Sequence, residues 1–163
     1  MLDTSVLDVW LQIPGNETCG PDEDKWDYRR VCGKIEEESN KGTLFVLPLA
    51  TIIETGNHIA QSSGDKYAIV NSFSDLIIDT IEENKPWAAF TVQSKMWSGD
   101  GLRVLINRWR KTAISGQSMG DASIVDVAEY YAQIGYQVEI LTGDRGLKAY
   151  EPRQAVLTPR RRR

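Results

Sequence analysis

Short apolar runs alternate with longer segments of helical periodicity along this chain, a pattern typical of an α/β domain built from crossover units. Each short run is rich in residues that favour a buried strand. Strands are predicted over residues 43–47, 88–92 and 137–142, with Met1-Leu2 as the stump of a further strand and residues 156–157 as an edge.

Five longer segments place apolar residues at spacings of three and four, as amphipathic helices do. In the clearest of them, Phe73, Leu76 and Ile77 follow this spacing. Another segment contains Gly99 and Gly101, so its helix is broken there or begins late. The predicted helices cover residues 22–39, a segment starting near residue 48, residues 65–83, part of 94–112, and residues 121–134.

Length and composition narrow the class of protein. The 163 residues, of which 41% are hydrophobic and 26% charged, suit one globular domain. No run approaches the roughly 18 apolar residues of a membrane span, and Asp3 precedes any apolar core of a signal peptide. Cys19 and Cys32 are too few for a zinc site or a disulfide framework. We therefore expect a cytoplasmic protein with reduced thiols and no membrane contact.

The net charge of −4 hides an uneven distribution along the chain. Residues 1–90 contain 16 Asp and Glu against 7 Lys and Arg, whereas residues 91–163 contain 7 against 12. A basic face can bind RNA phosphates even in an acidic protein, although two differently solvated surfaces explain the same asymmetry. The candidate phosphate contacts are Arg103, Arg108, Arg110, Lys111, Arg145 and Lys148.

Four acidic residues lie where an α/β sheet holds ligands, at the ends of predicted strands or near the starts of the helices that follow. They are Asp3, Glu54, Asp121 and Asp144, each beside small residues. Because parallel strands end at one edge of a sheet, we expect these carboxylates to converge. Converging carboxylates repel one another unless a cation compensates, and Mg²⁺ or Mn²⁺ prefers oxygen ligands. Taken singly, each acid also has an ordinary structural explanation, such as a helix cap or a turn.

The four acids sit in four sequence pieces: Leu2-Asp3-Thr4-Ser5-Val6-Leu7, LATIIETG at 49–56, GDASIVDVA at 120–128 and ILTGDRGL at 140–147. In order and approximate spacing, these pieces resemble the PIN-domain nucleases, in particular the VapC-type toxins. The resemblance extends over nearly the whole chain. This sequence departs from the family pattern at Ser5, where many members have asparagine, and in the long stretch between the second and third acids.

The resemblance implies a three-layer α/β/α fold with a short, mostly parallel sheet flanked by helices, over residues 1–158, followed by a basic tail at 159–163. It also implies that Asp3, Glu54, Asp121 and Asp144 bind Mg²⁺ or Mn²⁺ and hydrolyse phosphodiester bonds in RNA. An antitoxin or other regulatory protein, and a second copy of the chain, are the implied protein partners. The hydroxyls implied to position the acids or water are those of Thr4, Ser5 and Thr142.

His58 is the only histidine, and it follows Glu54 by four residues on the same helix face. We interpret it as a surface or packing residue rather than a general base or metal ligand, the usual role of a lone helical histidine. Two other functions stay open. A PIN-like domain that binds RNA or protein without cutting needs no metal, and an aspartate-based phosphatase would need a second aspartate where this chain has Ser5.

Overall fold

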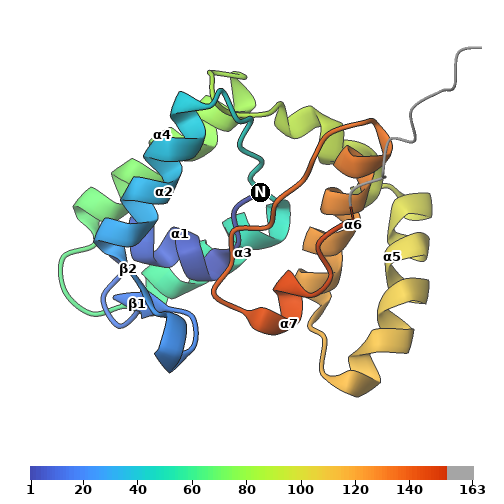
Figure 1. The fold of residues 1–163 in the computed structure, drawn as a ribbon, viewed down its shortest axis with the longest axis horizontal. Helices are drawn as coiled ribbons and strands as arrows, with labels where there is room; N and C mark the ends of the chain where they lie inside the picture. The colour runs from blue at the N-terminus through green and yellow to red at the C-terminus, as the bar shows by residue number, and fades with distance from the viewer. Residues whose placement is uncertain (154–163) are drawn as a thin grey trace, which may run out of the picture.

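The structure is a computed structural model that describes residues 1–153, and helices make up 62% of them (Figure 1). The one sheet in this range has two antiparallel strands, β1 (Thr18–Cys19) and β2 (Trp26–Asp27), with Thr18 opposite Asp27. The α-helices of this range are α1 (Thr4–Trp10), α2 (Tyr28–Asn40), α3 (Leu49–Gln61), α4 (Tyr67–Ile81), α5 (Gly99–Thr112), α6 (Met119–Gln133) and α7 (Arg145–Lys148). Three 3₁₀ segments lie between them: η1 (Asp22–Asp24), η2 (Phe90–Trp97) and η3 (Ala113–Ser115).

The predicted α/β/α fold with a parallel sheet core is therefore wrong. The segments predicted as strands lie side by side but form only isolated parallel bridges, Leu2 with Leu141 and Phe45 with Trp87, the residue before the predicted strand 88–92. Single backbone hydrogen bonds also join them, such as Leu2 N to Val46 O at 3.0 Å. Each segment turns into a helix before a ladder can extend: α1 begins two residues after Leu2, and η2 occupies most of the predicted strand 88–92. Short apolar runs cannot by themselves distinguish a strand from a buried extended connection, since both hide every side chain.

All five predicted helices are confirmed, as α2 to α6, because their signals are local. α5 begins at Gly99, capped by the Ser98 hydroxyl, which agrees with the predicted late start of this helix. α2 begins only at Tyr28, capped by Asp27, since η1 and β2 occupy the first residues of the predicted range. α1 and α7 were not predicted, because they are too short to show a periodicity.

The apolar side chains form two clusters that share the central extended segments. One joins α1, α2, α3 and α4 and contains Leu7, Val31 and Phe73. The other surrounds α6 and contains Ile124 and Ile140, with α5 on the outer side of α6 (Figure 1). Burial of such side chains contributes about 1.5–3 kcal/mol each, so these clusters fix how the helices lie relative to one another.

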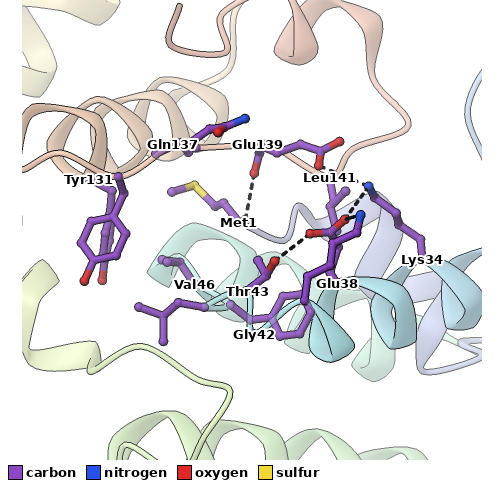
Figure 2. Close-up of a pocket in the computed structure, with 15 residues that line it drawn as sticks. Met1, Lys34, Glu38, Gly42, Thr43, Val46, Tyr131, Gln137, Glu139 and Leu141 are labelled. Carbon is purple, nitrogen blue, oxygen red and sulfur yellow. Dashed lines mark hydrogen bonds and ion pairs between the residues drawn. The ribbon is translucent and has the colours of Figure 1, made fainter. Parts of the chain in front are cut away.

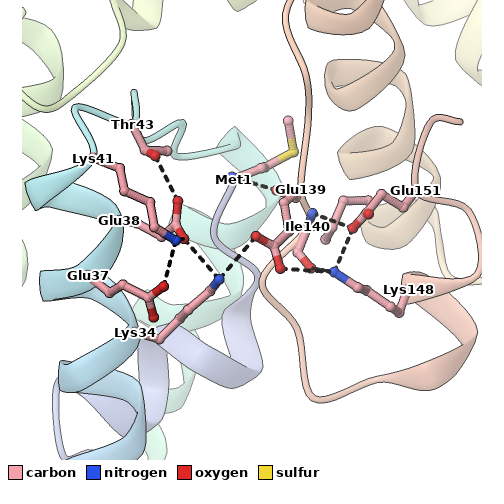
Figure 3. Close-up of polar contacts among 10 residues, drawn as sticks. All are labelled: Met1, Lys34, Glu37, Glu38, Lys41, Thr43, Glu139, Ile140, Lys148 and Glu151. Carbon is pink, nitrogen blue, oxygen red and sulfur yellow. Dashed lines mark hydrogen bonds and ion pairs between the residues drawn. The ribbon is translucent and has the colours of Figure 1, made fainter. Parts of the chain in front are cut away.

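A network of ion pairs fastens α2 to the segment that follows α6 (Figure 3). Lys34 Nζ lies 3.0 Å from Glu38 and 3.3 Å from Glu139, and Lys148 lies 2.6 Å from Glu151. Hydrogen bonds from Lys41, Thr43 and Lys34 lower the pKa of Glu38 to about 2. The Glu38 carboxylate is therefore held in its charged form at the contact between α2 and the segment that follows α6.

The predicted edge strand at 156–157, the boundary at 158 and the basic tail at 159–163 lie outside the described residues. No helix within residues 1–153 is long and apolar enough to cross a membrane.

Candidate functional site

The four acids selected from the sequence line one cavity of about 290 Å³. Asp3 immediately precedes α1, Glu54 lies in α3, Asp121 lies in the first turn of α6, and Asp144 immediately precedes α7. The residues come together although the parallel sheet that was expected to gather them is not formed. Helix starts, rather than strand ends, hold three of the four.

Asp3 is almost fully buried and accepts hydrogen bonds from two of the three hydroxyls that the resemblance implied, those of Ser5 and Thr142. Its Oδ2 accepts hydrogen bonds from Ser5 Oγ and Thr142 Oγ1, both at 2.7 Å, and from the Ser5 amide at 3.4 Å. The same hydroxyls accept from the backbone beyond Leu141, Ser5 Oγ from Gly143 N and Thr142 Oγ1 from Asp144 N, both at 2.9 Å. The loop that bears Asp144 is thus tied to Asp3.

Glu54 joins α3 to both α1 and α6. Its Oε2 accepts a hydrogen bond from Thr4 Oγ1 at 2.8 Å. Its Oε1 lies over Gly120, where an added Cβ would come within 2.2 Å of that oxygen. Asp121, the next residue, forms a capping box with Ser118, whose amide donates to Asp121 Oδ2 at 3.3 Å. Only a glycine at position 120 lets Glu54 lie this close to the start of α6.

Asp144 caps α7: its Oδ1 accepts from the amides of Gly146 at 2.6 Å and Leu147 at 3.4 Å. The preceding Gly143 presses against β1, and a Cβ there would lie 2.4 Å from the backbone nitrogen of Gly20 and 2.8 Å from Cys19 Cβ. Close backbone approach therefore fixes this side of the cavity.

One oxygen of each carboxylate is occupied by these contacts. Within residues 1–153 the other oxygen accepts no hydrogen bond: Oδ1 of Asp3, Oε1 of Glu54, Oδ1 of Asp121 and Oδ2 of Asp144. An all-oxygen, anionic donor set has the chemistry that Mg²⁺ and Mn²⁺ require. No group of three or more His, Cys, Asp or Glu side chains in the described part of the chain is already arranged to hold a metal ion. The donors suit the ion by type, and their side chains would have to move to enclose it.

Two further residues of the cavity, Asp8 and His58, form a pair that the sequence analysis missed. Asp8 comes from α1 with its side chain 3% exposed, and its Oδ2 lies 2.5 Å from Nδ1 of His58, which is 42% exposed. Burial raises the pKa of the Asp8 carboxyl, and the hydrogen bond to His58 opposes this. The interpretation of His58 as a surface or packing residue stays a prediction, to which the structure adds the contact with Asp8. The sequence signal that could have indicated this pair is helical spacing, which places residues four apart on one face. Asp8 is four residues after Thr4, and His58 is four residues after Glu54.

None of the six basic residues predicted to contact phosphate lines this cavity. Arg108 pairs with Asp126 and Glu129, and Arg145 with Glu23. Arg145 and Lys148 line a neighbouring groove of about 180 Å³ that also contains Asp144. The remaining three are exposed and form no ion pair within residues 1–153: Arg103, Arg110 and Lys111.

A larger cavity of about 590 Å³ lies between α2 and the segment after α6 (Figure 2). Tyr131 and Gln137 line one side and Lys34 and Glu38 the other. Its charged residues are already paired with one another, and none of the four selected acids lies in it. The cavity of about 290 Å³, by contrast, combines a histidine with carboxylate oxygens that accept no hydrogen bond within residues 1–153.

A cavity lined by four carboxylates has the chemistry to bind a hard cation and a phosphodiester whose charge the cation neutralises.

Comparisons of the chain with protein-family models, curated proteins and solved structures found no match.

Proposed function

We propose that this protein is a ribonuclease that hydrolyses phosphodiester bonds in the acidic cavity with the help of Mg²⁺ or Mn²⁺. The observation that supports the proposal is that Asp3, Glu54, Asp121 and Asp144, from four distant segments, line one cavity, each with an oxygen free of hydrogen bonds among the described residues. Carboxylates gathered at one cavity repel one another unless a cation compensates their charge.

The side chains of the cavity would divide the work between them. Thr4 holds one oxygen of Glu54, and Ser5 with Thr142 holds one oxygen of Asp3, so the opposite oxygen of each carboxylate is left for an ion. A bound divalent cation supplies a water of lowered pKa and neutralises charge that develops on the phosphate. These hydrogen bonds hold one oxygen of Asp3 and one of Glu54, and the carboxylates would still have to move to enclose the ion.

RNA as the substrate rests on the resemblance of the four sequence pieces to PIN-domain nucleases. Arg145 and Lys148 line the groove beside Asp144 and are of the type that contacts phosphates, and both also pair with acids, Arg145 with Glu23 and Lys148 with Glu139 and Glu151. An antitoxin-like inhibitor and self-association belong to the same proposal and do not affect its test.

The test begins with calorimetric titration of Mn²⁺ into EDTA-stripped protein at pH 7, followed by cleavage of a structured RNA. We expect the wild type to bind Mn²⁺ and cut, and Asp121→Asn to lose both. Asparagine retains the side-chain oxygen of the capping box, so thermal denaturation should change little. Asp100→Asn is the matched control, because Asp100 also lies in the first turn of a helix but outside the cavity.

Cleavage that persists at the wild-type rate in Asp121→Asn would overturn the proposal. RNA binding by the wild type with no Mn²⁺ uptake and no cleavage would favour a domain that binds RNA without cutting it.

A further inference from the structure

The pair of Asp8 and His58 joins α1 to α3 at the cavity through a buried carboxylate. Asp8 Oδ1 and the neighbouring Thr55 Oγ1 are both buried and form no hydrogen bond of good geometry within residues 1–153, although Thr55 lies close enough to lower the pKa of the Asp8 carboxyl. Burying a polar atom without a partner destabilises a fold, and burying a carboxylate does so more strongly. An apolar residue at position 8 would avoid this cost, so the pair calls for a functional explanation.

We propose that His58 donates the proton that the leaving oxygen needs when the phosphodiester breaks, and that Asp8 is its positioning residue. This inference rests on the proposed nuclease function of the same cavity.

The geometry leaves one imidazole nitrogen for this task. Nδ1 is engaged by Asp8 at 2.5 Å, so Nε2 is the nitrogen that remains on a ring 42% exposed at the cavity wall. A carboxylate on Nδ1 fixes the orientation of the ring and stabilises the imidazolium, as it does wherever histidine relays protons.

The other titratable groups of the cavity cannot easily replace it. They are Asp3 before α1, Glu54 on α3, Asp121 on α6, Asp144 before α7 and the Cys19 thiol on β1. A carboxylate that coordinates a cation carries no proton to give, and burial raises the pKa of Cys19, which keeps that thiol a weak acid. Imidazole is the remaining kind of side chain on the cavity wall that commonly gives protons in catalysis.

The step balances in atoms and charge. The oxygen of the attacking water forms a new bond to phosphorus and gives its proton to solvent. The bond from phosphorus to the bridging ribose oxygen breaks, with its electron pair on that oxygen. The imidazolium gives its Nε2 proton to this oxygen, leaving an RNA hydroxyl and a neutral imidazole that regains a proton from water.

The test compares two RNA oligonucleotides of one sequence. In the second, sulfur replaces the bridging oxygen that wild-type cleavage identifies as the leaving atom, and a thiolate leaves without being protonated. For His58→Gln we expect kcat to fall about 10²–10⁴-fold on the normal RNA and less than about fivefold on the sulfur RNA. Asp8→Asn should show the same pattern more weakly. Asn57→Ala, exposed on the same helix and outside the cavity, is the control.

The outcomes separate this inference from the proposal beneath it. A wild type that cuts neither RNA refutes the nuclease function itself. A wild type that cuts both, with His58→Gln unchanged or reduced equally on the two, leaves the nuclease and overturns the proton donor.

A second readout does not depend on turnover. Because the chain has one histidine, a ¹⁵N spectrum of the imidazole reports His58 alone. The neutral ring should carry its proton on Nδ1 in the wild type and lose this preference in Asp8→Asn. A neutral ring protonated on Nε2 in the wild type would overturn the positioning role of Asp8.

Discussion

Replacing Gly120 by alanine should change the geometry of the cavity without lowering the stability of the fold. This substitution gives the sharpest prediction. An added Cβ would lie 2.2 Å from Glu54 Oε1, whereas an ordinary contact begins at 3.4 Å. The carboxylate must therefore retreat by about 1.2 Å, which strains its 2.8 Å hydrogen bond from Thr4. The atom displaced is the end of a flexible side chain, so the backbone does not have to move.

A misplacement of this size in a catalytic group costs about 10²-fold in rate. We expect Gly120→Ala to lose about 10²-fold in kcat/KM for Mn²⁺-dependent RNA cleavage and to bind Mn²⁺ more weakly in the calorimeter. Alanine has the higher helix propensity, by up to about 1 kcal/mol inside a helix, so the variant should be at least as stable as the wild type in urea denaturation.

Gly33→Ala is the matched control, since Gly33 also lies in a helix and its added Cβ would meet nothing within 4 Å. It should gain similar stability and keep full activity. Wild-type cleavage by Gly120→Ala would refute the role of Glu54, and a marked loss of stability would refute the reasoning that only its side chain moves.

Two further predictions concern stability. Gly143→Ala forces a Cβ to within 2.4 Å of the Gly20 backbone, which cannot yield as a side chain does, so we expect unfolding in urea to be easier by about 1–3 kcal/mol; stability equal to that of the wild type would contradict the close packing against β1. The pKa of Glu38 is lowered from 4.5 to about 2, so between these values the unfolded chain binds more protons than the folded one, and stability should fall as the pH falls through this window. Glu38→Gln should flatten that part of the curve of Tm against pH, and an unchanged slope would show that other carboxylates cause the acid sensitivity.

The helices were predictable because their signals are short-range. A spacing of three and four residues buries one face of a helix whatever lies against it, and caps such as Ser98 act within one turn. Three of the selected acids are held by residues close to them in sequence, as Asp3 is by Ser5, because helix starts and turns bring such neighbours together. Glu54 is instead held by Thr4, 50 positions away.

The predicted sheet failed because strand pairing is a long-range property. Leu2 and Leu141 meet 139 positions apart and make one bridge, and the segment of Leu2 adds no second bridge because α1 begins at Thr4. Whether an apolar run joins a ladder depends on the length of its partner, which periodicity does not report.

The sequence by itself determined the five longer helices and the identity of four acids in small-residue surroundings, since both follow from contacts within a few residues. Only the tertiary structure decided that these acids line one cavity, that Asp8 holds His58 across 50 positions, and that Arg108 and Arg145 are paired with acids. The physical reason is that side chains distant in sequence meet only after the two apolar clusters have fixed the helices in space.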